Sequence, residues 1–310
     1  MRYGFGVDLG GTTVKIAFFS EEGTMLAKWE IPTNTENAGA QILPDIAASV
    51  LEYLERSGVP KTDILGIGIG VPGPVDDMGL VNRCHNLGWG VFNIHEELGR
   101  LTGMRVVAGN DATVAALGEC WKGGGGGCQS MVFVTLGTGV GGGIVVGGKV
   151  VNGAHGAGGE IGHMVLNRNE TESCTCGKRG CVEQYCSATG IVRLMKKHLA
   201  ASDRVSVLRG RKFTCKDVFD AAEGGDIPAT EVLEQVYAYL GEFLAGVCCV
   251  VDPEVVVLGG GVSKAGQPLL EGAQRYFEHY CFHACSDTRF SLATLGNDAG
   301  AYGAFKLILD

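Results

Sequence analysis

The 310-residue chain has no block of Lys and Arg interleaved with aromatic residues, and its formal net charge is −9, which argues against a nucleic-acid-binding surface. Glycine or polar residues interrupt its apolar runs, so we expect no membrane-spanning segment. The N-terminal residues are typical of a strand and not of a signal peptide. These absences predict a globular, cytoplasmic protein, and the length suffices for two domains.

Glycine, in contrast, is abundant, with 51 residues, and it marks a pattern that occurs twice. A strand over 3–9, a tight Gly/Thr turn and a strand over 14–19 are predicted first, with a third strand over 24–31. The motif Val7-Asp8-Leu9-Gly10-Gly11-Thr12 returns as Val134-Thr135-Leu136-Gly137-Thr138-Gly139. The repeat predicts a duplicated domain in which each half has its own mixed sheet, and the run Gly123–Gly127 predicts a mobile connection near the boundary. Helices are expected over 38–54, 94–102, 187–200, 215–222 and 229–250, with a last one from Ala299.

The two Gly/Thr turns are the first indication of chemistry. Gly lets backbone N–H groups approach a phosphate closely, and small hydroxyls add further donors. Two related turns, one per domain, predict that nucleotide phosphates are held between the domains. The expected phosphate-binding residues are Gly10, Gly11, Thr12, Thr13, Gly137, Thr138 and Gly139. Asp8, at the end of the first strand, is a candidate to hold Mg²⁺ through water, with turn capping as the alternative.

A third glycine site follows the apolar run 255–258, which predicts a strand. Gly259, Gly260 and Gly261 would let a flat base lie against the backbone, as an adenine pocket requires. A simple strand-to-helix turn is the alternative interpretation.

A short apolar strand over 104–108 leads to Gly109-Asn110-Asp111, and a helix of small residues follows. Asn110 and Asp111 therefore lie at the carboxyl end of a strand, where sites in open α/β sheets are found. A carboxylate there can take a proton from a sugar hydroxyl during phosphoryl transfer. The alternative is that Asp111 is only the N-cap of the helix, a common use of Asp.

Three cysteines lie close together in Cys174-Thr175-Cys176-Gly177-Lys178-Arg179-Gly180-Cys181, and His163 precedes them. Three thiols and one imidazole fit a closed tetrahedral Zn²⁺ site, which would be structural because it leaves no open position. The expected ligands are His163, Cys174, Cys176 and Cys181, and the other nine cysteines are expected to be reduced. Glu160 and Glu183 flank this loop and could accept hydrogen bonds from a polyol, with solvated surface positions as the alternative.

The chain resembles bacterial glucokinases of the ROK (repressor, ORF, kinase) family, within the actin-like superfamily of sugar kinases and heat-shock ATPases. The resemblance rests on Asp8-Leu9-Gly10-Gly11-Thr12, Gly109-Asn110-Asp111-Ala112, Leu136-Gly137-Thr138-Gly139, Glu160-Ile161-Gly162-His163, the segment 70–76 and, most specifically, the Cys cluster with Glu183. It implies two related α/β domains of the ribonuclease H-like fold with an interdomain cleft. We expect a small domain over 1–111, completed by a helix over 299–310, and a large domain over 112–298.

The resemblance also implies ATP-dependent phosphorylation of glucose at its 6-hydroxyl, with ATP, Mg²⁺ and structural Zn²⁺, in a homodimer or homotetramer. Asp111 would be the base, and the residues around the sugar would be Gly73, Asn86, Asn110, Asp111, Glu160, His163 and Glu183. The family usually has Lys directly after Gly-Gly-Thr, where this chain has Thr13, with Lys15 two residues on. Repressor members carry an N-terminal helix-turn-helix, whereas the first strand here is expected from residue 3. Kinases for N-acetylmannosamine, N-acetylglucosamine, fructose or allose, or a non-catalytic sugar sensor, remain alternatives, as do polyphosphate or ADP as donors.

Overall fold

The computed structural model describes residues 1–309 and, among these, every side chain except that of His85. The chain folds into two compact units. Unit 1 contains Met1–Gln129, Gly143–Gly159 and the residues from Leu295 onward. Unit 2 contains Ser130–Gly142 and Glu160–Thr294. The chain forms two five-stranded sheets, as the repeated motif predicted.

The sheet of unit 1 has the order β3-β2-β1-β4-β7. Its first three strands form an antiparallel meander, and β4 and β7 are parallel to β1. The strands are β1 (Tyr3–Leu9), β2 (Thr13–Ser20), β3 (Met25–Pro32), β4 (Ile64–Val71) and β7 (Val106–Asn110). A separate hairpin pairs β5 (Leu80–Cys84) with β6 (Trp89–Asn93). The three parallel strands end at one edge of the sheet, where the candidate site begins.

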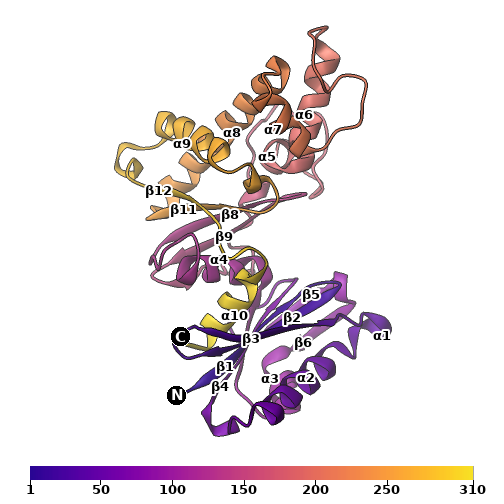
Figure 1. The fold of residues 1–310 in the computed structure, drawn as a ribbon, viewed down its shortest axis with the longest axis vertical. Helices are drawn as coiled ribbons and strands as arrows, with labels where there is room; N and C mark the ends of the chain where they lie inside the picture. Colours follow the sequence, from indigo (N-terminus) through magenta and orange to yellow (C-terminus); the bar gives the residue numbers. More distant parts are fainter. Residues whose placement is uncertain (310) are drawn as a thin grey trace. The chain divides into compact units, whose positions relative to one another are not determined.

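Two pairs of helices belong to unit 1. Helices α2 (Ile42–Ser57) and α3 (Ile94–Thr102) pack against each other, and α4 (Asp111–Lys122) packs against α10 (Ala299–Leu309). Figure 1 shows α10, in yellow, beside the N-terminal strands, which it contacts at β1 and β4. The helix expected over 38–54 begins only at Ile42, because Asn37 and Ala38 adopt left-handed φ angles in the short α1 (Glu36–Gly39).

The first boundary between the two units falls after Gln129, whereas the sequence predicted it at residue 111. Helix α4 belongs to unit 1 because its backbone lies directly against that of α10. A Cβ atom on Gly303 of α10 would overlap the carbonyl of Val114 in α4, so only glycine permits this approach. The return of the C-terminal helix to the N-terminal half, which the sequence predicted, thus brings α4 into the same unit.

The second sheet, of which β8, β11 and β12 lie in unit 2, has the order β10-β9-β8-β11-β12 and repeats the order of the first sheet strand for strand. Strands β11 and β8 are parallel, as are β11 and β12. The bounds are β8 (Met131–Leu136), β9 (Val140–Val146), β10 (Lys149–Val150), β11 (Val255–Gly259) and β12 (Arg289–Leu292). Strand β9 runs from unit 2 into unit 1, where its last residues pair with β10. The shared order supports the duplication and agrees with the ribonuclease H-like fold that was expected.

The helices of unit 2 are α5 (Glu183–Cys186), α6 (Ala188–Ala201), α7 (Cys215–Glu223), α8 (Ile227–Val251) and α9 (Gln267–Tyr280). Helix α8 corrects the expectation about apolar runs, since by length and composition it could cross a membrane. Half of its most apolar 18-residue window is buried in the protein, and it packs against α6, α7 and α9. A buried core helix meets the same criteria, so this helix is weak evidence for a membrane span.

Candidate active site

The register of the parallel strands brings Asp8 and the β7–α4 turn to one edge of the unit 1 sheet. Asp8 in β1 lies opposite Gly70 in β4, and Gly70 lies opposite Gly109 in β7. Neighbouring strands are about 4.8 Å apart, so two strand spacings, about 10 Å, separate the Asp8 and Gly109 backbones. Asn110 and Asp111 directly follow Gly109, which puts two carboxylates at the carboxyl edge of the sheet.

The N-cap of α4 is Asn110, and Asp111 is the first residue of the helix. Asn110 Oδ1 accepts the N–H groups of Ala112 at 3.0 Å and Thr113 at 3.3 Å, while its Nδ2 donates to the Gly73 carbonyl at 3.2 Å. The interpretation of Asp111 as a mere N-cap is therefore wrong, because the neighbouring amide has that function. Asp111 Oδ1 accepts the adjacent Ala112 N–H at 2.7 Å.

The environment of Asp111 favours its protonated form. Burial is the largest cause that raises the pKa of this carboxyl, and the negative charge of Asp8 adds to it, against hydrogen bonds from the Ala112 amide that lower it. A carboxylate with a raised pKa is a stronger base than an ordinary one. The same residue is therefore suited to accept a proton from a hydroxyl.

Gly73 and Asn86 lie on two turns that Cys84 joins. Gly73 follows β4 and offers its carbonyl to Asn110, and the buried Cys84 thiol donates to the Pro72 carbonyl at 2.7 Å. Asn86 lies in a short 3₁₀ turn, His85–Leu87, and is exposed. Gly73 is thus hydrogen-bonded to Asn110, the neighbour of Asp111, and Asn86 lies on the turn that follows Cys84.

The first Gly/Thr turn lies at the same edge of unit 1. The Gly10 N–H donates to the Thr13 carbonyl at 3.0 Å, which closes the turn and leaves Gly11 and Thr12 exposed. Lys15 is the cross-strand partner of Asp8, and its ammonium lies 3.4 Å from Asp8 Oδ2 and 3.3 Å from the Asn297 carbonyl. Lys15, two residues after the position at which the family usually has Lys, therefore faces the carboxylate of Asp8, the candidate Mg²⁺ ligand.

The second Gly/Thr turn and the triple glycine lie at one edge of unit 2. Parallel strands β8 and β11 pair with Gly259 opposite Thr135, so the turn after β8 and the glycines after β11 leave the sheet on the same side. The Gly137 carbonyl accepts the Ala188 N–H at 2.8 Å, and the Thr138 carbonyl accepts the Thr189 hydroxyl at 2.8 Å. The start of α6 thus supports the phosphate turn.

A cavity of about 510 Å³ extends from this turn along α6. Apart from Thr138, sequence reasoning did not identify its lining residues, since a helix with Lys and Arg on one side is also typical of a solvated surface. The lining consists of Thr138, Ala188, Thr189, Val192, Arg193, Lys196, Lys197 and Cys215. Its position beside Thr138 makes it a candidate for the remainder of a nucleotide.

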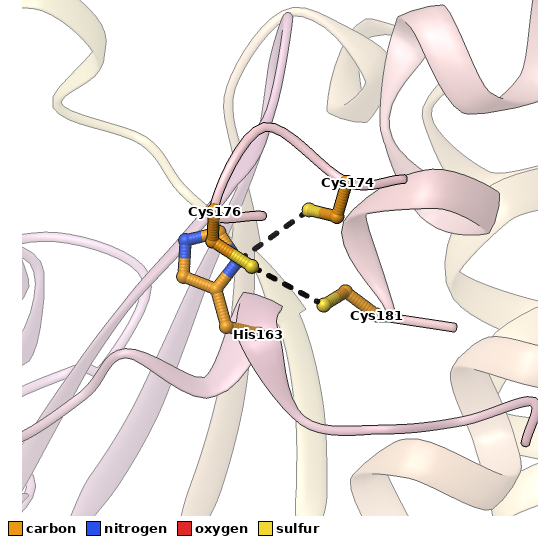
Figure 2. Close-up of side chains that lie close together, drawn as sticks. All are labelled: His163, Cys174, Cys176 and Cys181. Atoms are coloured by element: carbon orange, nitrogen blue, oxygen red, sulfur yellow. Dashed lines mark hydrogen bonds between the residues drawn. The ribbon is translucent and has the colours of Figure 1, made fainter. Parts of the chain in front are cut away.

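The four expected metal ligands converge on one point, as Figure 2 shows. His163 Nδ1 lies 3.8 Å from Cys174 Sγ, the Cys176 and Cys181 sulfurs are 3.6 Å apart, and all four donor atoms lie within 4.8 Å of one another. Tetrahedral Zn²⁺ with metal–sulfur bonds of about 2.3 Å requires sulfurs about 3.8 Å apart. The donor set and its spacing therefore fit a metal ion of this kind.

Glu160 and Glu183 differ in their surroundings. Glu160 is exposed, and its Oε2 lies 4.0 Å from the Nε2 of His163, the ring nitrogen that faces away from the thiols. Glu183 accepts the Thr175 hydroxyl at 2.6 Å and the Val140 N–H at 3.2 Å. Burial alone would raise the pKa of Glu183, but these hydrogen bonds outweigh it and lower that pKa. Glu183 thus joins the metal loop to the second Gly/Thr turn, and its side chain lies against Gly139.

The predicted residues therefore form two groups, each within one unit. Unit 1 holds the first turn and the residues near Asp111, and unit 2 holds the second turn, the triple glycine, the metal ligands, Glu160 and Glu183. This division matches the two halves of the duplicated sequence.

Comparisons with known proteins agree with this geometry. The family model described as "ROK family" matches residues 4–310. A glucokinase of Halalkalibacterium halodurans is 42% identical over 99% of this chain and 95% of its own, and one of Thermotoga maritima is 37% identical over 98% and 96%. A ROK family glucokinase from Streptomyces griseus, solved in complex with glucose and AMPPNP, has a TM-score of 0.72 and 31% identity over 98% of both chains. The chain belongs to the ROK family.

Proposed function

We propose that this protein is a glucokinase, which transfers the γ-phosphoryl group of ATP to the 6-hydroxyl of glucose with Asp111 as general base. The observation that carries the proposal is the position of Asp111 at the carboxyl edge of the sheet, with its pKa raised and the capping of α4 left to Asn110. The choice of glucose follows the relatives named glucokinase, of which one is 42% identical over nearly the whole chain.

Asp111 accepts the proton of the 6-hydroxyl while that oxygen attacks the γ-phosphorus. Asn110, held by Gly73, orients the sugar beside the base, together with Asn86, Glu160, His163 and Glu183. A Mg²⁺ ion bound with ATP supplies neutralisation of the triphosphate charge, and Asp8 would hold it through water, since carboxylate oxygens are the ligands it prefers. In a loose transition state this positioning supplies most of the catalysis, and the base adds about 10²–10⁴ in rate.

Each Gly/Thr turn is a phosphate-binding segment of its own unit, and the cavity beside Thr138 takes the nucleoside. The exposed turn at Gly11 and Thr12 offers backbone N–H groups, and Lys15 adds one positive charge next to Asp8. Gly259, Gly260 and Gly261 flank the base of the nucleotide. Support for this assignment comes from the shared edge of β8 and β11.

The Cys/His cluster holds a structural Zn²⁺. His163, Cys174, Cys176 and Cys181 supply all four ligands, so the ion orders the loop and does not touch substrate. Since His163 Nδ1 faces the thiols, its Nε2 is left to a sugar hydroxyl, with Glu160 as neighbour. The ion thereby fixes the direction of a sugar-binding side chain.

The direct test is product formation with glucose and Mg-ATP, measured by coupling to glucose 6-phosphate dehydrogenase. ADP release is also measured with N-acetylmannosamine, N-acetylglucosamine, fructose and allose at equal concentration. Polyphosphate and ADP are tried as phosphoryl donors in place of ATP. The highest kcat/KM for glucose with ATP is expected. A higher value for another hexose would assign that sugar instead, and sugar binding without turnover for any hexose would identify a sensor. A homodimer or homotetramer and a cytoplasmic location are part of the proposal, and light scattering tests the first.

A further inference from the structure

Two cysteine thiols lie in contact outside the residues assigned to sugar, nucleotide and metal. Cys120 is in the last turns of α4, and Cys128 follows the five-glycine run Gly123–Gly127. Their sulfurs are 2.9 Å apart, closer than the 3.6 Å between Cys176 and Cys181 of the metal cluster. The two residues are not joined by a disulfide in the structure, and 2% of Cys120 and 7% of Cys128 is exposed.

The backbone around the two sulfurs holds them together. The Gly127 N–H donates to the Cys120 carbonyl at 2.9 Å, and the Cys120 thiol donates to the Cys128 carbonyl at 3.0 Å. The Gly125 N–H also bonds the Glu119 carbonyl at 2.9 Å. The glycine run thus folds back onto the end of α4. These hydrogen bonds offset the conformational entropy that is lost when the two thiols are brought together, before any S–S bond forms.

A cavity of about 170 Å³ reaches both cysteines. Its lining includes Trp121, Lys149 and Lys306 besides the two thiols, and Lys149 is exposed. The thiolate is the reactive form of cysteine. A small, uncharged oxidant such as hydrogen peroxide is of a size that this cavity admits.

We propose that Cys120 and Cys128 are a redox-active dithiol, a modification site for peroxides. The Cys128 thiolate attacks one peroxide oxygen, so that an S–O bond forms, the O–O bond breaks and hydroxide leaves to become water. The Cys120 sulfur then attacks the sulfenic sulfur, the S–S bond forms, and a second water leaves. Two thiols and one hydrogen peroxide give one disulfide and two water molecules, and a dithiol reductant reverses the change.

The disulfide would link the glycine run covalently to helix α4, which begins with Asp111. In the reduced protein, the run is held to α4 by hydrogen bonds that can open. In the oxidised protein, the covalent link closes a short loop that stays closed. The amides of Gly123–Gly127 should therefore exchange their hydrogens more slowly, and the denaturant midpoint of unfolding should rise.

Peptide mapping of the metal-loaded full chain tests the proposal. Trypsin cleaves after Lys122, between the two cysteines, so Cys120 falls in peptide 106–122 and Cys128 in peptide 123–149. After treatment with hydrogen peroxide and alkylation of the remaining thiols, the two peptides should appear joined, and dithiothreitol should separate them. Slower exchange at the glycine run should accompany the joined species and reverse with it.

Cys120→Ser and Cys128→Ser should each abolish the joined species, whereas Cys249→Ser, which removes an exposed thiol on α8, should retain it. The wild-type map alone decides the question if a variant fails to fold. The proposal is overturned if the two peptides stay separate while other thiols are oxidised, if Cys128 stops at sulfinic acid, or if either cysteine pairs elsewhere. These readouts do not depend on the kinase assay, so either proposal can fail without the other.

Discussion

Replacing Asp111 with Asn tests the proposed base with little disturbance of the fold. Asp111 Oδ1 accepts the Ala112 N–H at 2.7 Å, and the amide oxygen of Asn can accept the same bond. The N-cap, Asn110, stays intact. Because a general base contributes about 10²–10⁴ in rate, kcat should fall by that factor, or about 3–5 kcal/mol in activation free energy. KM for glucose should change less than about threefold, since binding contacts remain.

The raised pKa of Asp111 gives this variant a second signature, in stability. Burial is the largest cause and the charge of Asp8 adds to it, so the folded-state pKa lies above the 3.8 of an unperturbed Asp. Ionised Asp111 therefore destabilises the fold at neutral pH, a cost that a neutral Asn does not carry. The free energy of unfolding of Asp111→Asn at pH 7 should equal or exceed that of the wild type. The difference should shrink as the pH falls through the raised pKa towards 3.8.

The control for the loss of one negative charge is Asp203→Asn, at an exposed position after α6, which should leave kcat and stability unchanged. Turnover is measured by the coupled dehydrogenase assay and stability by urea unfolding at several pH values. The acid limb of the wild-type profile of kcat/KM should also be absent from Asp111→Asn. Turnover within threefold of the wild type, or a loss confined to KM, would refute the assignment of the base.

Three further changes have expected outcomes. Lys15→Met removes an ammonium 3.4 Å from Asp8 and should raise KM for Mg-ATP about tenfold in steady-state kinetics. The control Lys61→Met should leave this KM unchanged. Equal KM values in the two variants would exclude Lys15 from the triphosphate site. Burial alone would raise the pKa of Glu170, but hydrogen bonds from Arg193 and others lower it to about 2, so its ionised form stabilises the fold above about pH 4.5 and this stability is lost as the pH falls towards 2. Glu170→Gln should cost about 1–2 kcal/mol in urea unfolding at pH 7, more than Glu172→Gln, and a deficit that persists at low pH would contradict this origin. Chelation of the metal should lower the unfolding temperature and the calorimetric glucose affinity together, both restored by Zn²⁺; unchanged sugar affinity would show that the loop does not orient sugar ligands.

The strands were predictable because their signals are local. Glycine turns and apolar alternation gave a strand over 14–19 and one over 24–31, and the structure has β2 at Thr13–Ser20 and β3 at Met25–Pro32. The repeated motif predicted a duplication, and the two sheets have the same strand order. Spacing within one loop also predicted the four donor atoms that converge.

Features that depend on distant segments were not predictable in this way. Helix α4 belongs to unit 1 because Gly303, nearly two hundred residues later, lets α10 lie against Val114. The hydrogen bonds of Glu183 to Thr175 and Val140 depend on the path of the metal loop past β9. The N-cap of α4 is Asn110 and not Asp111, the residue considered as a cap from the sequence, because β7 extends through Asn110. Helix ends vary by one or two residues with local dihedral angles and capping hydrogen bonds, which composition does not fix.

The two units repeat one strand order but carry opposite chemistry at equivalent strand ends. Asp8 in β1 corresponds to Thr135 in β8 within the repeated motif, so a carboxylate in one unit is a neutral hydroxyl in the other. A polyanion is repelled by carboxylates and held by N–H groups, which suits the turns that follow β8 and β11. A hydroxyl that must lose a proton needs a carboxylate, which suits the edge with Asp8 and Asp111. In the proposed reaction, divergence at this position after duplication leaves a carboxylate at the end of β1 and a neutral hydroxyl at the equivalent end of β8.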